Sequence, residues 1–132
     1  MAGSVIQVLA PLRADGGRHT SVPYYEIWDH WDDDAGRYDR GYATFGPKLG
    51  NITNFTAVEL IYDGWLDTAY GAYVKVEKMS DYEVAGWVSI LDLDLYPGYW
   101  SCLGMSSRRI GALDALAVVI ENSGGLNYPQ CH

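Results

Sequence analysis

The chain has 132 residues, of which 48% are hydrophobic and 20% charged, and this balance excludes wholesale disorder. Its formal charge of −8 argues against nucleic acid and anionic membranes as partners, because both are negatively charged. No apolar run reaches the roughly 18 residues that a membrane helix requires, so no membrane insertion is expected. Eleven Tyr, five Trp and fifteen Gly favour a single all-β domain with many turns.

The N-terminal part is predicted to contribute one strand. Residues 4–10 (SVIQVLA) favour a strand that ends at Pro11. Residues 13–20 (RADGGRHT) show no periodicity and are rich in turn formers, so an exposed loop is expected there.

The next part of the chain predicts three strands separated by turns. Residues 24–31 favour a strand, and the aspartates and glycine of residues 32–36 break it. Residues 40–45 resume the alternation before a turn at residues 46–47 (GP). The closing strand is expected over residues 55–62. Its core face is expected to carry Thr56, Val58, Leu60 and Tyr62.

The second half begins with a half-buried strand in which Val74 and Val76 alternate with charged residues. The clearest period-two signal covers residues 87–95 (WVSILDLDL) and predicts one strand. Leu91, Leu93 and Leu95 are expected to point inward, and Asp92 and Asp94 outward. Residues 106–115 favour at most one short helical turn, and residues 123–132 form a tail.

These elements follow the same order twice, in residues 24–63 and in residues 73–122. Each copy has an opening strand, a glycine (Gly36 or Gly86), a further alternating stretch, a turn and a closing hydrophobic strand, expected at 114–120 in the second copy. The chain is therefore predicted to be one domain with an additional strand and loop over residues 1–23. Its fold class is all-β, a two-sheet antiparallel β-sandwich built from two Greek-key-like repeats.

Two such repeats resemble the paired Greek-key motifs of a βγ-crystallin domain. The resemblance implies a sandwich that is usually not an enzyme, in a family that includes structural proteins, calcium binders, protease inhibitors and toxin-like defence proteins. In that family a pair of Asn or Asp residues before the closing strand binds Ca²⁺. The corresponding pairs here are Ile52-Thr53 and Ala112-Leu113, so this sequence departs from the calcium motif in both copies.

An acidic cluster at the first predicted hairpin is a candidate metal site. Asp32, Asp33 and Asp34 are consecutive and precede Gly36, and Ca²⁺ prefers several oxygen ligands from a flexible loop. The stretch lacks the ligand alternation and terminal Glu of an EF-hand loop, so a solvated hairpin tip is the competing interpretation. No cofactor is expected to be required.

A small enzyme is an alternative function. Its acid–base residues would be Asp29, His30 or Asp32, together with a tyrosine such as Tyr38. The sequence contains none of the usual nucleophile, zinc or phosphate-loop motifs that would complete a mechanism.

Exposed aromatic and basic residues suggest a binding surface. Aromatic rings stack on the apolar faces of sugars, and Arg pairs with carboxylates, but core packing of the rings is the competing explanation. The candidate ligand-binding residues are Trp28, Trp31, Tyr99, Trp100, Arg108 and Arg109. Trp65 and Tyr96 are further candidates for the aromatic platform. The loop from Tyr96 to Arg109 is longer than its counterpart in the first copy, which favours a binding role.

The compartment depends on the two cysteines. A Cys102–Cys131 disulfide would require an oxidising compartment and would slightly favour secretion, whereas two thiols would favour the cytoplasm. Two glycosylation triplets, Asn51-Ile-Thr53 and Asn54-Phe-Thr56, also lean towards secretion.

Together these features favour a non-enzymatic binding or defence protein whose ligand is a carbohydrate or a protein. The small enzyme is one alternative, and an acidic immunity-type protein that neutralises a basic partner is another.

Overall fold

The computed structural model describes residues 5–62, 64–94, 113 and 116. The strands are β1 (Val5–Val8), β2 (Ser21–Trp28), β3 (Trp31–Asp32), β4 (Arg37–Tyr38), β5 (Thr44–Thr53), β6 (Ala57–Leu60), β7 (Leu66–Thr68), β8 (Gly71–Lys78), β9 (Asp81–Ser89) and β10 (Leu93–Asp94). A 3₁₀ turn, η1 (Ile90–Asp92), connects β9 to β10. Within these residues no helix is long and apolar enough to cross a membrane.

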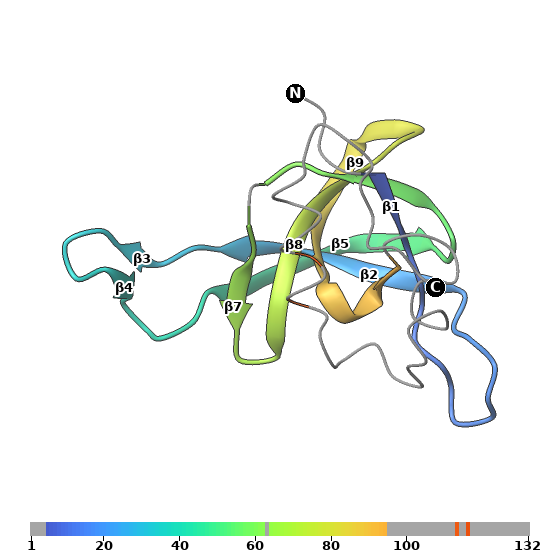
Figure 1. Cartoon of the computed structure of the whole chain (residues 1–132), viewed down its shortest axis with the longest axis horizontal. Coiled ribbons are helices and arrows are strands. Elements are labelled where there is room, and N and C mark those ends of the chain that lie inside the picture. Colours follow the sequence, from blue (N-terminus) through green and yellow to red (C-terminus); the bar gives the residue numbers. More distant parts are fainter. Residues whose placement is uncertain (1–4, 63, 95–112, 114–115, 117–132) are drawn as a thin grey trace, which may run out of the picture.

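The strands form two antiparallel sheets of unequal size (Figure 1). The large sheet has eight strands in the order β10-β1-β6-β8-β9-β2-β5, with β7 also paired to β8. The small sheet is the β3–β4 hairpin, which extends to one side of the molecule. The prediction of an all-β, two-sheet antiparallel fold is therefore confirmed.

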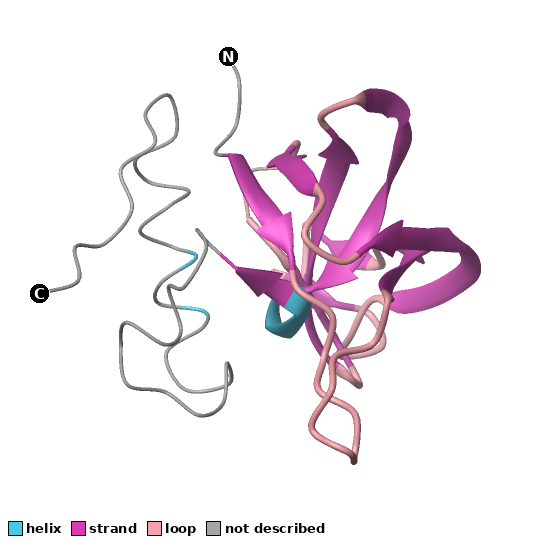
Figure 2. Ribbon diagram, turned by 90° about the vertical axis from the view of Figure 1, so that its right-hand side faces the viewer, coloured by secondary structure: helices cyan, strands magenta, loops and turns pink. Residues whose placement is uncertain are grey.

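The main core lies on one face of the large sheet, which curves strongly (Figure 2). Alternating residues such as Val74, Val76 and Val88 are fully buried on this face, as the period-two pattern predicts. Val58 and Leu60 of β6 join them, so the core face predicted for the first closing strand is confirmed at these two positions. Tyr62, expected on the same face, is 42% exposed.

A second, smaller core lies on the opposite face, near the hairpin. Its buried residues are Ile27, Ala43, Leu66 and Trp87, and Tyr25, Tyr38, Phe45 and Tyr73 pack against them. A bridge between Ala43 and Thr68 joins the chain just before β5 to β7. This bridge fixes the root of the hairpin to the large sheet.

The turn predicted at residues 46–47 is wrong, because β5 runs straight through both residues. Proline lacks a backbone donor and normally interrupts a sheet. Among the described strands β5 is the last in the order of the large sheet, so one of its edges has no described partner, and the β2–β5 register shifts near this point. An edge strand with irregular pairing therefore accommodates Pro47.

The single strand predicted over residues 87–95 is also wrong, although its described leucines do face the core. Strand β9 ends at Ser89, whose hydroxyl accepts a hydrogen bond from Leu91 N at 3.2 Å and caps η1. The turn changes the alternation, and β10 then pairs with β1. As a result Asp94, expected outside, is only 3% exposed, next to the fully buried Leu93.

The second copy differs from the first at its closing segment. Leu113 and Leu116 are helical, and Leu116 is buried in the main core. The comparison of the two copies predicted a strand at Leu116, so this prediction is wrong there. A short apolar run can bury a leucine in a helix as well as in a strand, so the hydrophobic pattern alone did not distinguish the two.

Candidate functional site

The most prominent surface feature is the acidic hairpin, residues 29–40. Its two-residue strands pair Trp31 with Tyr38 and Asp32 with Arg37. The Asp32 carboxylate accepts hydrogen bonds from the backbone N–H groups of Asp34 and Ala35, at 3.0 and 3.1 Å. Gly36 follows with a φ of +66°, a conformation that glycine adopts without strain. The predicted turn at residues 32–36 is therefore confirmed.

Three contacts hold the root of the acidic hairpin. Asp39 N donates to His30 O at 2.9 Å, and Ala43 N donates to Asp67 O at 2.9 Å. His30 Nε2 lies 3.0 Å from Thr44 Oγ1, and this contact ties the first residues of the hairpin to the start of β5. The hairpin therefore projects beyond the sheet from a fixed base (Figure 1).

The acidic hairpin concentrates charge. It contains five aspartates and two arginines, a net charge of −3 over twelve residues. The aspartates are all exposed: Asp29, Asp32, Asp33, Asp34 and Asp39. Within the described part of the chain none of these seven side chains forms an ion pair; the ion pair there joins Arg13 to Asp15. The negative field of the hairpin is thus not neutralised locally.

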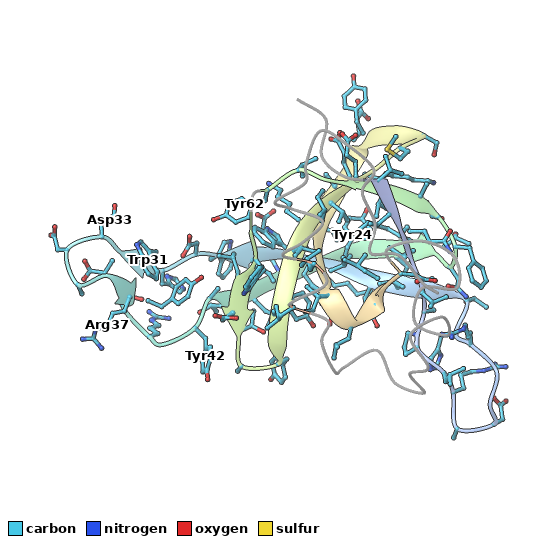
Figure 3. The ribbon with its side chains drawn as sticks, in the orientation of Figure 1. Tyr24, Trp31, Asp33, Arg37, Tyr42 and Tyr62 are labelled. Carbon is cyan, nitrogen blue, oxygen red and sulfur yellow. The ribbon has the colours of Figure 1, made fainter. Side chains whose placement is uncertain are left out.

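One aromatic side chain is held among these charges. Trp31 is 50% exposed, and its ring meets Tyr38 edge-on, with centroids 5.2 Å apart and planes at 86°. Figure 3 shows Trp31, Asp33 and Arg37 on the hairpin. A shallow, open concavity of about 490 Å³ is lined by His30, Trp31, Asp32, Asp33, Asp34 and Asp39. The predicted binding residue Trp31 and the three predicted metal ligands therefore share one site.

A catalytic unit at this site has little geometric support. The described partner of the His30 ring is the Thr44 hydroxyl, and the Asp29 carboxylate accepts from Trp31 N at 2.9 Å. Burial, followed by the charges of Asp29 and Asp67, raises the pKa of Tyr38, which keeps its phenol protonated and unsuited to act as a base.

The metal interpretation is likewise not favoured by the geometry. Among the residues that the structure describes, no three His, Cys, Asp or Glu side chains are grouped so that they could hold a metal ion. Asp32 instead uses a carboxylate oxygen to form the turn. Calcium binding by Asp32, Asp33 and Asp34 stays a prediction, which a Ca²⁺ titration of the melting temperature would test.

Trp28 lies just before the hairpin and forms a separate aromatic surface. Its ring packs against Gly46 of β5, where an added Cβ would lie 3.1 Å from two ring atoms. The indole is nevertheless 51% exposed. One side of the ring is therefore supported by the sheet while half of its surface stays open to solvent.

Several predicted site residues lie outside the described residues: Tyr96, Tyr99, Trp100, Arg108, Arg109, Cys102 and Cys131. Trp65 is described and packs against the main core, which favours the structural explanation of that ring.

Sequence reasoning missed the partners of the exposed rings. Tyr38 pairs with Trp31, and Gly46 supports Trp28. The symmetry of a hairpin about residues 33–36 would have predicted the first contact, but no local signal predicted the second.

Comparison with family models, curated proteins and solved structures finds no match to this chain. The resemblance to βγ-crystallins stays a prediction.

Proposed function

We propose that this protein is a non-enzymatic binding protein whose acidic hairpin docks a protein partner with a basic surface. The observation that supports it most is the concavity in which Trp31 lies among four exposed aspartates. This proposal combines two of the functions that the sequence favours, a binding protein and an acidic protein that neutralises a basic partner.

The charge of the hairpin suits a basic partner. The hairpin carries five exposed aspartates and two arginines, and it projects from the body of the protein. Few cationic side chains therefore lie near the aspartates to weaken their negative field. Such a field accelerates the encounter with a positively charged surface and disfavours acidic ones. The overall charge of −8 acts in the same direction.

Trp31 supplies the second requirement, an aromatic anchor. Tryptophan is enriched among the residues that dominate binding energy, and its ring attracts Arg and Lys cations. The edge-on contact with Tyr38 restricts the Trp31 ring before a partner arrives. Less conformational entropy is then lost on binding.

The test is isothermal titration with a synthetic peptide of nine arginines, followed by the same peptide at higher salt. Trp31→Ala removes the anchor and should weaken binding about five- to tenfold, the equivalent of a cation–π contact of roughly 1 kcal/mol or more. The matched control is Tyr82→Ala, since Tyr82 is 75% exposed on β9, away from the hairpin.

The charge is tested separately. Asp33→Asn and Asp34→Asn, each made singly, should reduce affinity and flatten its salt dependence, whereas Glu83→Gln, which removes one exposed acid on β9, should change both far less. Equal losses in the hairpin and control variants would show that only the overall charge matters, and the proposal would fail. Circular dichroism of each variant confirms that the fold is retained.

A carbohydrate ligand is the second candidate, and the supported, half-exposed ring of Trp28 favours it. A glycan array should then give signals that Trp28→Ala abolishes and Tyr82→Ala leaves intact. Silence across a broad array would count against this candidate and leave the basic partner as the better explanation.

A further inference from the structure

Two glycosylation triplets follow each other directly at the end of β5, and the structure treats their asparagines differently. Asn51 and Thr53 belong to β5, whereas Asn54 and Phe55 form the turn into β6. An oligosaccharide chain needs an asparagine side chain that reaches solvent in the folded protein.

Asn51 meets this requirement. Ile52 is 2% exposed and points into the main core, so its two neighbours in the strand point to the opposite side. Asn51 and Thr53 are both exposed, which leaves the acceptor amide and the hydroxyl of the triplet on the same outer surface. Among the described residues no side-chain hydrogen bond involves Asn51.

Asn54 has a structural role. Its Oδ1 accepts a hydrogen bond from Ala10 N at 2.8 Å, and its backbone N donates to Thr20 O at 2.9 Å. The next residue, Phe55, has a φ of +67° and donates to Val8 O at 2.9 Å. Asn54 is half-buried and connects the end of β1 to the β5–β6 turn.

We propose that Asn51 is an N-glycosylation site and that Asn54 is not. In the transfer, Asn51 Nδ2 forms a bond to the anomeric carbon of the sugar and loses a proton, while the bond from that carbon to the diphosphate of a lipid-linked oligosaccharide donor breaks. A membrane oligosaccharyltransferase supplies the catalysis. A sugar attached to Asn54 would have to be accommodated in a half-buried turn, so a protein modified there would fold poorly.

The position of Asn51 is compatible with the proposed binding surface on the acidic hairpin. Thr44, at the other end of β5, contacts His30 of the acidic hairpin. Asn51 lies seven positions after Thr44 along the strand, which corresponds to a distance on the order of 20 Å. The oligosaccharide would also cover part of β5, which lies at the edge of the large sheet among the described strands, and hinder its pairing with strands of other molecules.

The experiment secretes the full chain from a eukaryotic host behind a cleavable signal and measures intact mass before and after peptide N-glycosidase. The expected result is one oligosaccharide per modified chain. Digestion in ¹⁸O-labelled water should mark Asn51. Asn51→Gln and Thr53→Ala should each remove the modification, and Thr56→Ala should leave it at Asn51.

Thr56→Ala removes the second triplet but keeps Asn54 Oδ1, the side-chain oxygen that accepts the hydrogen bond from Ala10 N. This variant therefore stays informative if Asn54→Gln does not fold. An oligosaccharide on Asn54, on both asparagines or on neither in the secreted protein would each overturn the proposal. The result does not depend on what the hairpin binds.

Discussion

The large sheet and the acidic hairpin are stabilised by different means. The sheet buries side chains on both faces, with the main core on one side and the smaller core on the other. The hairpin has strands of two residues and no buried residue between 29 and 40. Hydrogen bonds at its turn and root, one ring pair and the packing of Tyr38 against the smaller core hold it. Side chains that the fold does not need can serve binding, which is why we place the function on the hairpin.

Truncation of the main core should produce the largest loss of stability. Ile6 is 3% exposed in β1, and Ile6→Ala leaves a cavity that should lower the free energy of unfolding by roughly 2–5 kcal/mol. Urea denaturation measures this loss. The exposed Tyr82→Ala serves as the control, and an equal effect in both variants would contradict the described core.

Gly86→Ala should have the next largest effect. A Cβ at Gly86 would lie 2.7 Å from Tyr24 Cδ2 and 3.1 Å from Tyr25 O, so the added methyl overpacks the sheet at a cost of roughly 1–3 kcal/mol. Because Tyr24 is the nearest obstacle, Gly86→Ala and Tyr24→Ala should destabilise by less together than the sum of their separate effects. Simple additivity would show that the Tyr24 ring does not cover Gly86.

The smaller core should respond to high pH. Burial, followed by the charges of Tyr25 and Asp92, raises the pKa of Tyr73 from 10.0 to about 12. The folded state thus holds this proton more tightly than the unfolded state does, and the stability that results is present below pH 10 and is lost as pH rises towards 12. Denaturation at pH 9 and pH 11.5 should show a smaller loss in Tyr73→Phe than in the parent protein. Identical slopes would contradict the shift.

The hairpin turn should give the smallest change in global stability. Asp32→Ala removes the acceptor for Asp34 N and Ala35 N, and a lost cap of this kind costs about 1 kcal/mol. Hydrogen exchange at Gly36, whose N–H bonds to Asp32 O, should accelerate, while amides of β8 and β9 stay protected. Asp32→Asn keeps an acceptor oxygen and should preserve the turn, which separates hydrogen bonding from charge.

The sequence by itself determined the all-β class, the buried alternation at Val74 and Val76, and the turn at residues 32–36. These depend on local rules: side chains alternate along a strand, and Asp and Gly favour turns. The exposed acidic cluster beside Trp31 was also predictable, because consecutive aspartates remain in solvent unless something pairs with them.

Only the tertiary structure decided which strand lies at the edge and which contacts the rings make. Pro47 continues a strand because β5 is the last strand of the sheet, and Asp94 is buried because η1 redirects the chain to pair with β1. Gly46 supports Trp28 across a gap in sequence that local patterns do not encode. Strand order is set by the packing of the whole chain, so it decides which polar and aromatic groups remain at the surface.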